Sequence, residues 1–426
     1  MGSNRVCMHV GRGLRWGCVA LGMIAVLLVG CAIAASPTPT PEPVKILFAF
    51  PSDLADHYDG LIEAFNEQHP DIIVERRTIS SVEKWEYLLR ENQVDVFVLS
   101  NDDETFYDLY EDGSLLSLMP FLQESNDIDL DDFYPDVLRA FRLEGSVWAI
   151  PAGVNMGVMY YNKDLFDQNN APYPQIGWTW EDFLLAGSAV TDPDEDVFGF
   201  VTYPVFAIPF IYQHGGAIFD DEDMPTRTTF DDPLTIEAIE WYASLVHDYE
   251  VMPSPAEATK RFGNDGSAGY IFWRNGAGMY LGFLSDRGGE SWGPSARWQM
   301  EWGMVPLPRD QGGFTFAFVI GHAAVADTEH PQACWEFLTF LNEHTMPYVM
   351  PARRSVVESV AFEDQVGPEV AAVVRASIED MVVVSDLPDS LEQGMVGFIE
   401  TLIAILDGEM TVDEGLAQLQ MQSESG

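Results

Sequence analysis

VKILFAF, at residues 44–50, is an apolar run of strand length that ends at Pro51. Apolar side chains then recur at helical spacing, and another apolar run, VDVFVL, follows at 94–99. The expected elements are a strand at 44–50, a helix at 54–65, a strand at 72–75, a helix at 80–90 and a strand at 94–99. This alternation of strands and helices predicts a largely parallel sheet in an α/β fold.

Polar residues follow the first and third of these strands. Ser52 and Asp53 come after the first strand, and Asn101 and Asp102 come after the third. Both loops are candidate ligand-binding loops, because ligands of α/β sheets collect at the carboxyl ends of parallel strands. Serine, asparagine and aspartate also cap helices, and capping is an equally good interpretation of any single one of them.

Further along the chain, a second α/β unit is expected. WAIP at 148–151 predicts a strand that ends at a proline, and VMYY at 158–161 predicts another strand. TWEDF at 179–183 opens a helix, with Thr179 as its N-cap and acidic residues in its first turn. Later patterns predict a strand at 198–201, a helix from 230 onward, a strand at 320–326 and a helix at 331–341.

The first 30 residues differ from the rest of the chain. They contain three arginines and no acidic residue, and an apolar stretch covers 16–30, which is the pattern of an export signal. The stretch ends in LVGC at 28–31, which resembles the bacterial lipobox, where cleavage before the cysteine leaves Cys31 to carry lipid. Two alternatives are cleavage at Ala32-Ile33-Ala34 by an ordinary signal peptidase and an uncleaved membrane helix over 17–35.

A proline-rich segment follows the cysteine. SPTPTPEP at 36–43 favours an extended spacer that cannot pack into a core, and so predicts a stalk. After cleavage only Cys31 and Cys334 would remain, and with Cys31 acylated no internal disulfide is expected. Cys334 lies in an apolar helical pattern, which predicts a buried, inert thiol.

Charge and motif content exclude several functions. The chain has 21 basic and 68 acidic residues, and its net charge of −47 argues against binding nucleic acid. It has no GxSxG elbow, no HExxH motif, no phosphate-binding GxxxxGK[ST] loop and no clustered histidines, so no catalytic residue, cofactor or metal is expected. A secreted carbohydrate-active hydrolase stays open as an alternative, because a pair of carboxylates suffices for that chemistry.

Three motifs occur in a fixed order: WAIP at 148–151, YYNKDLF at 160–166 and WTWEDF at 178–183. At this spacing they resemble the signature of the extracellular solute-binding proteins of ABC transporters, in their sugar-binding, maltose-binding-like class. Weaker matches in the order that this family shows are Phe65-Asn66 with Pro70, Gly215-Gly216, NGAGM at 275–279, the helix at 333–341 and the acidic segment at 406–414. The resemblance covers nearly the whole mature chain.

This resemblance implies a two-lobed, periplasmic-binding-protein-like fold of type II, with a cleft between α/β lobes and a hinge that the chain crosses several times. The crossings would fall near 151–155, 306–308 and 344–351. One lobe would comprise 44–153 and 307–345, and the other 154–306 and 346–426. Hinges made of a few residues allow such lobes to close around a ligand.

A sugar presents hydroxyl groups at its edge and apolar C–H faces, so its site needs aromatic and planar polar side chains. By position in the family, the resemblance places these residues in the cleft: Ser52, Asp53, Asn101, Asp102, Asn155, Tyr203, Tyr212 and Phe283. A buried core turn is the alternative for the aromatic segment at 203–212. Phe283 departs from the family, which commonly has tryptophan near this position, and this departure bears on sugar specificity.

Two further candidates come from the residues themselves. Trp292 lies in a glycine-rich acidic loop and is a candidate for an exposed aromatic platform. Arg354 is one of few cations in an acidic chain, and it either pairs with neighbouring acids or meets an anionic group of the ligand.

The function implied by the resemblance is capture of a sugar, an oligosaccharide or a polyol outside the cell and its delivery to the permease subunits of an ABC transporter. The protein would act as a monomer, exported and held on the outer face of the cell membrane by lipid on Cys31. Besides the hydrolase, a surface sensor or interaction lipoprotein without a transporter is an alternative.

Overall fold

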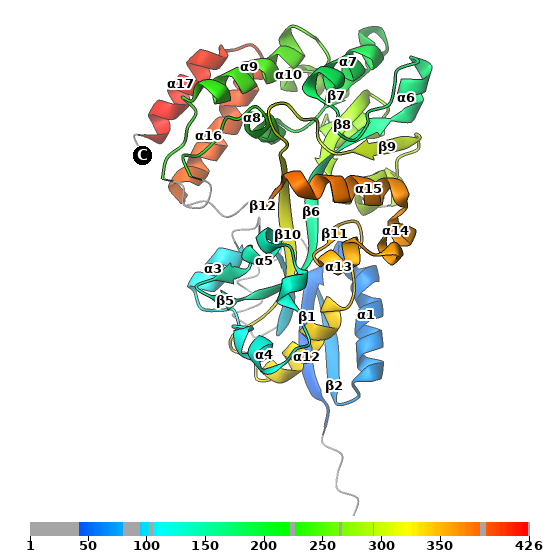
Figure 1. Ribbon diagram of the computed structural model, residues 1–426, viewed down its shortest axis with the longest axis vertical. Coiled ribbons are helices and arrows are strands. Elements are labelled where there is room, and N and C mark those ends of the chain that lie inside the picture. The colour runs from blue at the N-terminus through cyan, green and yellow to red at the C-terminus, as the bar shows by residue number, and fades with distance from the viewer. Residues whose placement is uncertain are drawn as a thin grey trace, which may run out of the picture. The chain divides into compact units, whose positions relative to one another are not determined.

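The computed structural model describes residues 42–79, 94–101, 105–221, 226–263, 266–292, 294–383 and 389–424 (Figure 1). The expected export signal, Cys31, most of the stalk, the helix expected at 80–90 and Asp102 lie outside these residues. In the described part of the chain, no helix is both long enough and apolar enough to cross a membrane.

The first unit has the predicted alternation of strands and helices. Strand β1 (Val44–Pro51) pairs in parallel with β2 (Ile72–Ile79) and with β3 (Val96–Ser100), and helix α1 (Ala55–Gln68) connects β1 to β2. The apolar positions of α1 that the spacing singled out include Tyr58, Ile62 and Phe65, which are buried. The predicted α/β fold class is confirmed.

The remaining elements do not keep this alternation. The other strands are β4 (Arg142–Leu143), β5 (Ser146–Val147), β6 (Ala149–Asn162), β7 (Phe198–Val201), β8 (Ala277–Phe283), β9 (Trp302–Val305), β10 (Thr315–Ala324), β11 (Met350–Pro351) and β12 (Met381–Val383). The other helices are α3 (Thr105–Glu111), α4 (Met119–Glu124), α5 (Pro135–Arg139), α6 (Lys163–Gln168), α7 (Trp180–Val190), α8 (Ile208–Gln213), α9 (Pro233–His247), α10 (Pro255–Phe262), α11 (Ala268–Trp273), α12 (Pro331–Asn342), α13 (Arg354–Val357), α14 (Val360–Val366), α15 (Pro368–Ser377), α16 (Asp389–Leu406) and α17 (Val412–Ser423). The alternation is lost because β4–β6 and β8–β10 follow one another without an α-helix between them. Strand β10 pairs antiparallel with β3 and β6, and β6 pairs antiparallel with β8, so the sheet is mixed and not largely parallel as predicted.

Two long strands, β6 and β10, connect the two parts of the sheet, which are β2, β1 and β3 on one side and β8 and β7 on the other. The main strand order is β2-β1-β3-β10-β6-β8-β7, so β10 and β6 lie at its centre (Figure 1). Residues 149–156 of β6 pair with β10, and residues 157–161 pair with β8. The segment at 315–317 of β10 pairs with β12, and the segment at 320–324 pairs with β3. The chain thus passes from one part of the sheet to the other along continuous strands.

The continuity of β6 differs from the sequence prediction of two short strands on either side of 152–157. The prediction ended the first strand at Pro151, because proline lacks the backbone N–H group that donates to a neighbouring strand. The register between β6 and β10 shifts at this point: Pro151 lies opposite Gly321, and Gly153 lies opposite Ile320. This bulge accommodates the proline, so the strand continues through it.

Gly157 lies where β6 changes its pairing from β10 to β8. A Cβ atom at this position would lie 3.0 Å from the Thr315 hydroxyl oxygen and 3.1 Å from the Phe316 ring. The Thr315 hydroxyl also donates a hydrogen bond of 2.7 Å to the Gly157 carbonyl oxygen. The close approach of β10 therefore favours glycine at this point of the strand.

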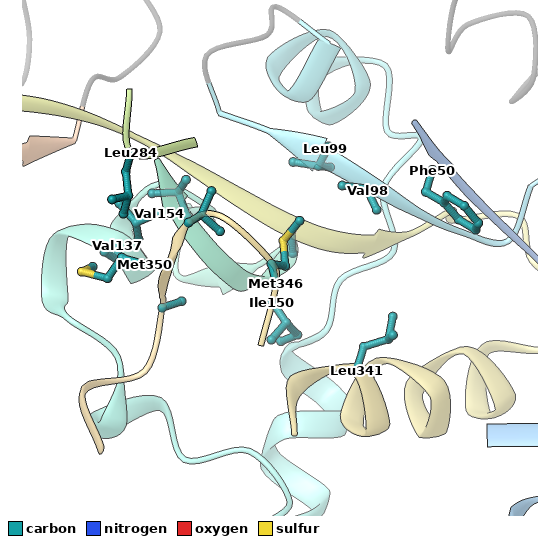
Figure 2. Close-up of a cluster of buried hydrophobic side chains, with 14 of the residues drawn as sticks. Phe50, Val98, Leu99, Val137, Ile150, Val154, Leu284, Leu341, Met346 and Met350 are labelled. Atoms are coloured by element: carbon teal, nitrogen blue, oxygen red, sulfur yellow. The ribbon is translucent and has the colours of Figure 1, made fainter. Parts of the chain in front are cut away.

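Two clusters of buried apolar side chains stabilise the fold. Figure 2 shows part of the first cluster, with Phe50 of β1, Val98 of β3, Ile150 of β6 and Leu341 of α12. The second cluster is built on α7, α8, α9, α16 and α17 and on one face of β8. Apolar residues between 350 and 383 belong to the first cluster, and those between 398 and 419 belong to the second. The predicted lobe boundaries remain a prediction.

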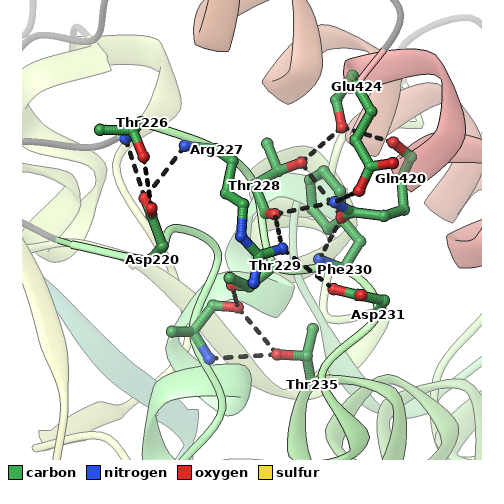
Figure 3. Close-up of polar contacts among 12 residues, drawn as sticks. Asp220, Thr226, Arg227, Thr228, Thr229, Phe230, Asp231, Thr235, Gln420 and Glu424 are labelled. Atoms are coloured by element: carbon green, nitrogen blue, oxygen red, sulfur yellow. Dashed lines mark hydrogen bonds and ion pairs between the residues drawn. The ribbon is translucent and has the colours of Figure 1, made fainter.

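The C-terminal helix α17 is fixed by one buried glutamine. The Gln420 amide oxygen accepts a 2.9 Å hydrogen bond from the Phe230 backbone N–H, and its amide nitrogen donates a 3.0 Å hydrogen bond to the Thr228 carbonyl oxygen (Figure 3). The helix also packs against α16 and α9. The last helix is therefore tied to a segment about 190 residues earlier in the chain.

We expect Gln420→Ala to lower the free energy of unfolding by about 1–3 kcal/mol, because the Phe230 N–H and the Thr228 carbonyl group would be left buried without these partners. Urea unfolding measures the change. The matched control is Gln418→Ala, two residues earlier on the exposed side of α17, which should change stability little. Equal losses in the two variants would contradict the role given to Gln420.

Candidate functional site

Strand β10 passes between two of the predicted ligand-binding asparagines. Asn101, directly after β3, is 2% exposed, and its side-chain oxygen accepts a 2.6 Å hydrogen bond from the Val319 N–H. On the other side of β10, Asn155 of β6 lies opposite Phe318. The two asparagines thus flank residues 318 and 319, and Asn101 holds the end of β3 against them.

Asn155 orders the turn that follows β8. Its side-chain nitrogen donates a 3.1 Å hydrogen bond to the Ser285 hydroxyl oxygen, and its side-chain oxygen accepts one of 3.1 Å from the Ser285 N–H. The residue is only partly buried. Asn155 therefore has a definite structural role at the point where the resemblance places a ligand contact.

Two buried tyrosines fix the same turn. The Tyr160 hydroxyl donates to the Phe283 carbonyl oxygen at 2.8 Å, and the Tyr280 hydroxyl donates to a carboxylate oxygen of Asp286 at 2.8 Å. That Asp286 oxygen also accepts a hydrogen bond of 2.9 Å from the Phe283 N–H. Burial is the main cause that raises the pKa of both tyrosines, so both stay protonated donors. The backbone of Phe283 is consequently held on both sides.

Phe283 belongs to an aromatic group that we call the aromatic row. Phe316 and Phe318 occupy alternate positions of β10 and so lie on one face of the strand, and Phe314 directly precedes the strand at the same spacing. The Phe283 ring lies 5.3 Å from the Phe316 ring and 5.5 Å from the Phe318 ring, measured between centroids. Phe314, Phe318 and Phe283 are only partly buried. The row comprises Phe206, Phe283, Phe314, Phe316 and Phe318.

Both predicted tyrosines of the segment at 203–212 contact this row. Tyr203 is 38% exposed and meets the Phe206 ring edge-on at 5.9 Å. Tyr212 stacks on Phe314, with 4.5 Å between the ring centroids and 11° between the ring planes. Its hydroxyl oxygen accepts a hydrogen bond of 3.3 Å from the Ile218 N–H. The segment is thus an aromatic wall beside the start of β10.

A buried glutamine that the sequence analysis did not single out positions this wall. Gln213 is fully buried, and its side-chain nitrogen donates a 3.0 Å hydrogen bond to the Phe314 carbonyl oxygen. Its side-chain oxygen accepts a 2.8 Å hydrogen bond from the Trp180 indole. Gln213 therefore links the TWEDF motif to the aromatic row. A signal for the row itself was present in the sequence, as the alternation FTFAF at 314–318.

The motif residues themselves have structural roles. Thr179 caps α7 by a capping box with Asp182, as predicted. The Trp178 indole donates a 2.9 Å hydrogen bond to the Pro306 carbonyl oxygen, and the Trp180 ring stacks on Trp241 with 3.9 Å between centroids. Both motif tryptophans are buried in the second cluster. The motifs thus mark the framework of the site rather than its lining.

The other predicted site residues lie elsewhere in the described structure. Ser52 and Asp53 are exposed in a 3-10 turn, η1 (Ser52–Leu54), directly after β1. Arg354 is exposed at the start of α13, and its guanidinium lies 5.3 Å from the centroid of the Tyr134 ring. The side chain of Trp292 lies outside the described residues, as does Asp102. The structure therefore brings together Asn101, Asn155, Tyr203, Tyr212 and Phe283 around the start of β10.

Histidine 214 connects α8 to the chain just before β10. Its Nδ1 lies 2.5 Å from a carboxylate oxygen of Asp310, and its Nε2 lies 3.3 Å from one of Glu237. Burial disfavours the charged imidazole, but hydrogen bonds to Asp310 and Glu237 outweigh it and raise the pKa of His214. In the described residues, no group of histidine, cysteine, aspartate and glutamate side chains is arranged to hold a metal ion.

The architecture is that of the two-lobed α/β binding proteins. An ABC substrate-binding protein from Listeria monocytogenes, solved in complex with cycloalternan, is 22% identical and has a TM-score of 0.74, with 90% of this chain and 99% of that chain covered. A solute-binding protein from Agrobacterium vitis S4 with bound D-mannitol is 18% identical and has a TM-score of 0.62, with 89% and 97% covered. These structures share the fold of this chain.

Sequence comparison gives the family. Residues 60–364 match the family of bacterial extracellular solute-binding proteins, and the chain belongs to that family. An arabinooligosaccharide-binding protein of Halalkalibacterium halodurans is 24% identical over 318 residues, which cover 69% of this chain and 66% of that protein. The resemblance drawn from the motifs is confirmed. By membership of this family, the protein is an exported solute-binding protein and not an enzyme.

The ion pairs of His214 predict a pH-dependent contribution to stability. Because the folded state raises its pKa above the ordinary value of 6.5, protonated His214 stabilises the fold fully at pH below that value. This contribution is lost as the pH rises through the folded-state pKa. We expect His214→Asn to lower the melting temperature more at pH 5.5 than at pH 8.5, as measured by calorimetry. A larger loss at pH 8.5 would contradict the assignment.

Proposed function

We propose that this protein is the substrate-binding component of an ABC importer and that it captures a neutral carbohydrate, either a sugar or oligosaccharide or a related polyol. The observation that carries the proposal is the aromatic row at the start of β10, which joins Phe283 to Phe316 and Phe318. Relatives that bind arabinooligosaccharides, cycloalternan and D-mannitol support this class of ligand.

The chemistry of the row suits such a ligand. The apolar C–H faces of a sugar ring pack on aromatic faces, and its hydroxyl groups need polar partners at the edges of the site. Phe314, Phe318 and Phe283 are partly exposed, and Asn155 and Tyr203 supply polar groups beside them.

We further propose that the ligand closes two lobes about β6 and β10. Each of these strands pairs with partners in both parts of the sheet, and the aromatic row lies where they do so. A ligand that contacts both parts would bind the closed state more tightly, and this difference in affinity is what drives closure. The lobe boundaries are those expected from the family resemblance.

Anchoring and delivery complete the proposal. Lipid on Cys31 would hold the protein at the outer face of the membrane, and the stalk at 36–43 would give it reach toward permease subunits. The protein would work as a monomer.

Ligand capture is tested by a thermal-shift screen with arabinotriose, maltotriose and D-mannitol. We expect at least one of them to stabilise the protein by about 2.7 kcal/mol at a concentration of 100 times Kd, without being hydrolysed. Phe318→Ala, Tyr212→Ala and Asn155→Ala should each weaken binding, by about two- to tenfold for the loss of an aromatic contact. The control is Tyr249→Ala, at an exposed position. Hydrolysis of a probe would contradict the proposal.

Lipid anchoring is tested separately, by expressing the chain in a bacterium. We expect wild-type protein to sediment with the membranes and Cys31→Ser to lose that association, because the acylated thiol is missing. Cys18→Ser, which changes a cysteine within the expected signal, should still sediment with the membranes. Equal sedimentation of Cys31→Ser and wild type would show that another segment anchors the protein.

A further inference from the structure

A cavity of about 170 Å³ lies beside Tyr203, at the carboxyl end of β7. Its walls come from β7, α9, α10, α11 and the last residue of α16, and the segment from 201 to 204 forms one side. The apolar part of the lining includes Met252, Ile271 and Leu406, which are all buried. The cavity therefore combines apolar walls with the exposed aromatic ring of Tyr203.

No charged side chain is found among the described residues that line this cavity. The uncharged lining contrasts with the composition of the whole protein, which has 68 acidic and 21 basic residues. The polar lining consists of hydroxyl groups, from Thr202, Tyr203, Tyr242, Thr259 and Ser267. Hydroxyl groups both donate and accept hydrogen bonds, so the lining matches a neutral ligand that carries hydroxyl groups.

Tyr242 is the most deeply buried of the hydroxyl-bearing residues that line the cavity. It is 1% exposed, and its hydroxyl makes no hydrogen bond to any residue in the described part of the chain. The other fully buried tyrosines do have partners, since Tyr58 bonds to His322, Tyr160 to Phe283 and Tyr280 to Asp286. Burial raises the pKa of Tyr242, so its hydroxyl stays neutral. The Tyr242 oxygen is not among the fully enclosed polar atoms that lack a partner, so it is open to the cavity that the residue lines. A ligand hydroxyl in the cavity would replace water as its partner.

The size of the cavity limits what it holds. About 150 Å³ is enough for a benzene-sized molecule, whereas sites for whole drug-sized ligands measure about 300–1,000 Å³. The cavity also adjoins the proposed binding site, because Tyr203 lines it and contacts Phe206 of the aromatic row. It thus has room for one ring or one branch of a larger ligand.

We propose that this cavity is a side pocket of the binding site, which takes one neutral hydroxylated unit of the ligand, with Tyr242 as its hydrogen-bonding group and Tyr203 at its edge. This inference rests on the proposed function, because it assigns a part of the same ligand. It makes residues of α9 and α10 determinants of ligand choice, although no motif of the sequence pointed to them.

Two substitutions test the pocket by calorimetric titration of the whole protein with arabinotriose, maltotriose and D-mannitol. Tyr242→Phe removes one hydroxyl and should weaken binding of at least one probe about two- to tenfold, the range of a single neutral hydrogen bond. Ala258→Leu fills the cavity from α10 and should weaken the same probe at least as much. The matched controls are Tyr249→Phe and Ala256→Leu, at exposed positions outside the lining, which should leave its affinity unchanged.

The outcomes separate this inference from the proposed function. If a probe binds wild type and both cavity variants equally, the side pocket is wrong and the proposed function stands. If no probe binds wild type, the proposed carbohydrate function is wrong, and the pocket falls with it. Far-UV circular dichroism and the melting temperature show whether Ala258→Leu has folded. Tyr242→Phe, which removes a single oxygen atom, decides the question if it has not.

Discussion

The pairing of β6 with β10 is the interaction on which the rest of this structure depends. Each strand is hydrogen-bonded to the other over residues 149–156 and 317–323, and each continues into a different part of the sheet. Because the two strands are continuous, the polar residues at their sides and the aromatic side chains on one face are placed by the backbone ladder. Gly157 lets β10 approach closely at this point. The candidate site is therefore built on the part of the fold that joins its two apolar clusters.

Much of this fold follows from local patterns in the sequence. The apolar runs of β1 and β3 and the helical spacing of α1 predicted a parallel sheet, and β1, β2 and β3 do pair in parallel. The central pairs of β10 with β3 and β6 are antiparallel, which the order of local patterns did not predict. The strand β6 was predicted less well. Pro151 indicated an end to the strand, and only the partner strand shows that a bulge opposite Gly321 accommodates the proline. A bulge depends on pairing between residues far apart in sequence, so a single-sequence pattern does not reveal it.

The site was also predictable only in part, because some of its residues are given by family position or by a local pattern and others depend on partners far away in the sequence. Family position placed Asn155, Tyr203, Tyr212 and Phe283 near one another, and the structure brings them around the start of β10. The alternation FTFAF at 314–318 was a readable strand signal for the aromatic row. Gln213 and Tyr242 had no such signal, because their importance comes from burial and from partners on other elements. The uncharged cavity beside Tyr203 likewise emerges only when α9, α10 and α11 are placed around β7.

In this acidic protein, the groups that would keep it soluble differ from the aromatic and hydroxyl groups at the proposed binding site. The charges keep the surface hydrated, while the proposed site would rely on stacking and neutral hydrogen bonds. The central claim is that a neutral sugar-like ligand closes the protein about β6 and β10. Small-angle X-ray scattering with and without a saturating concentration of the sugar or polyol that binds most tightly tests this claim directly. A smaller radius of gyration in the bound protein is the predicted result, and an unchanged radius with the site fully occupied would contradict it.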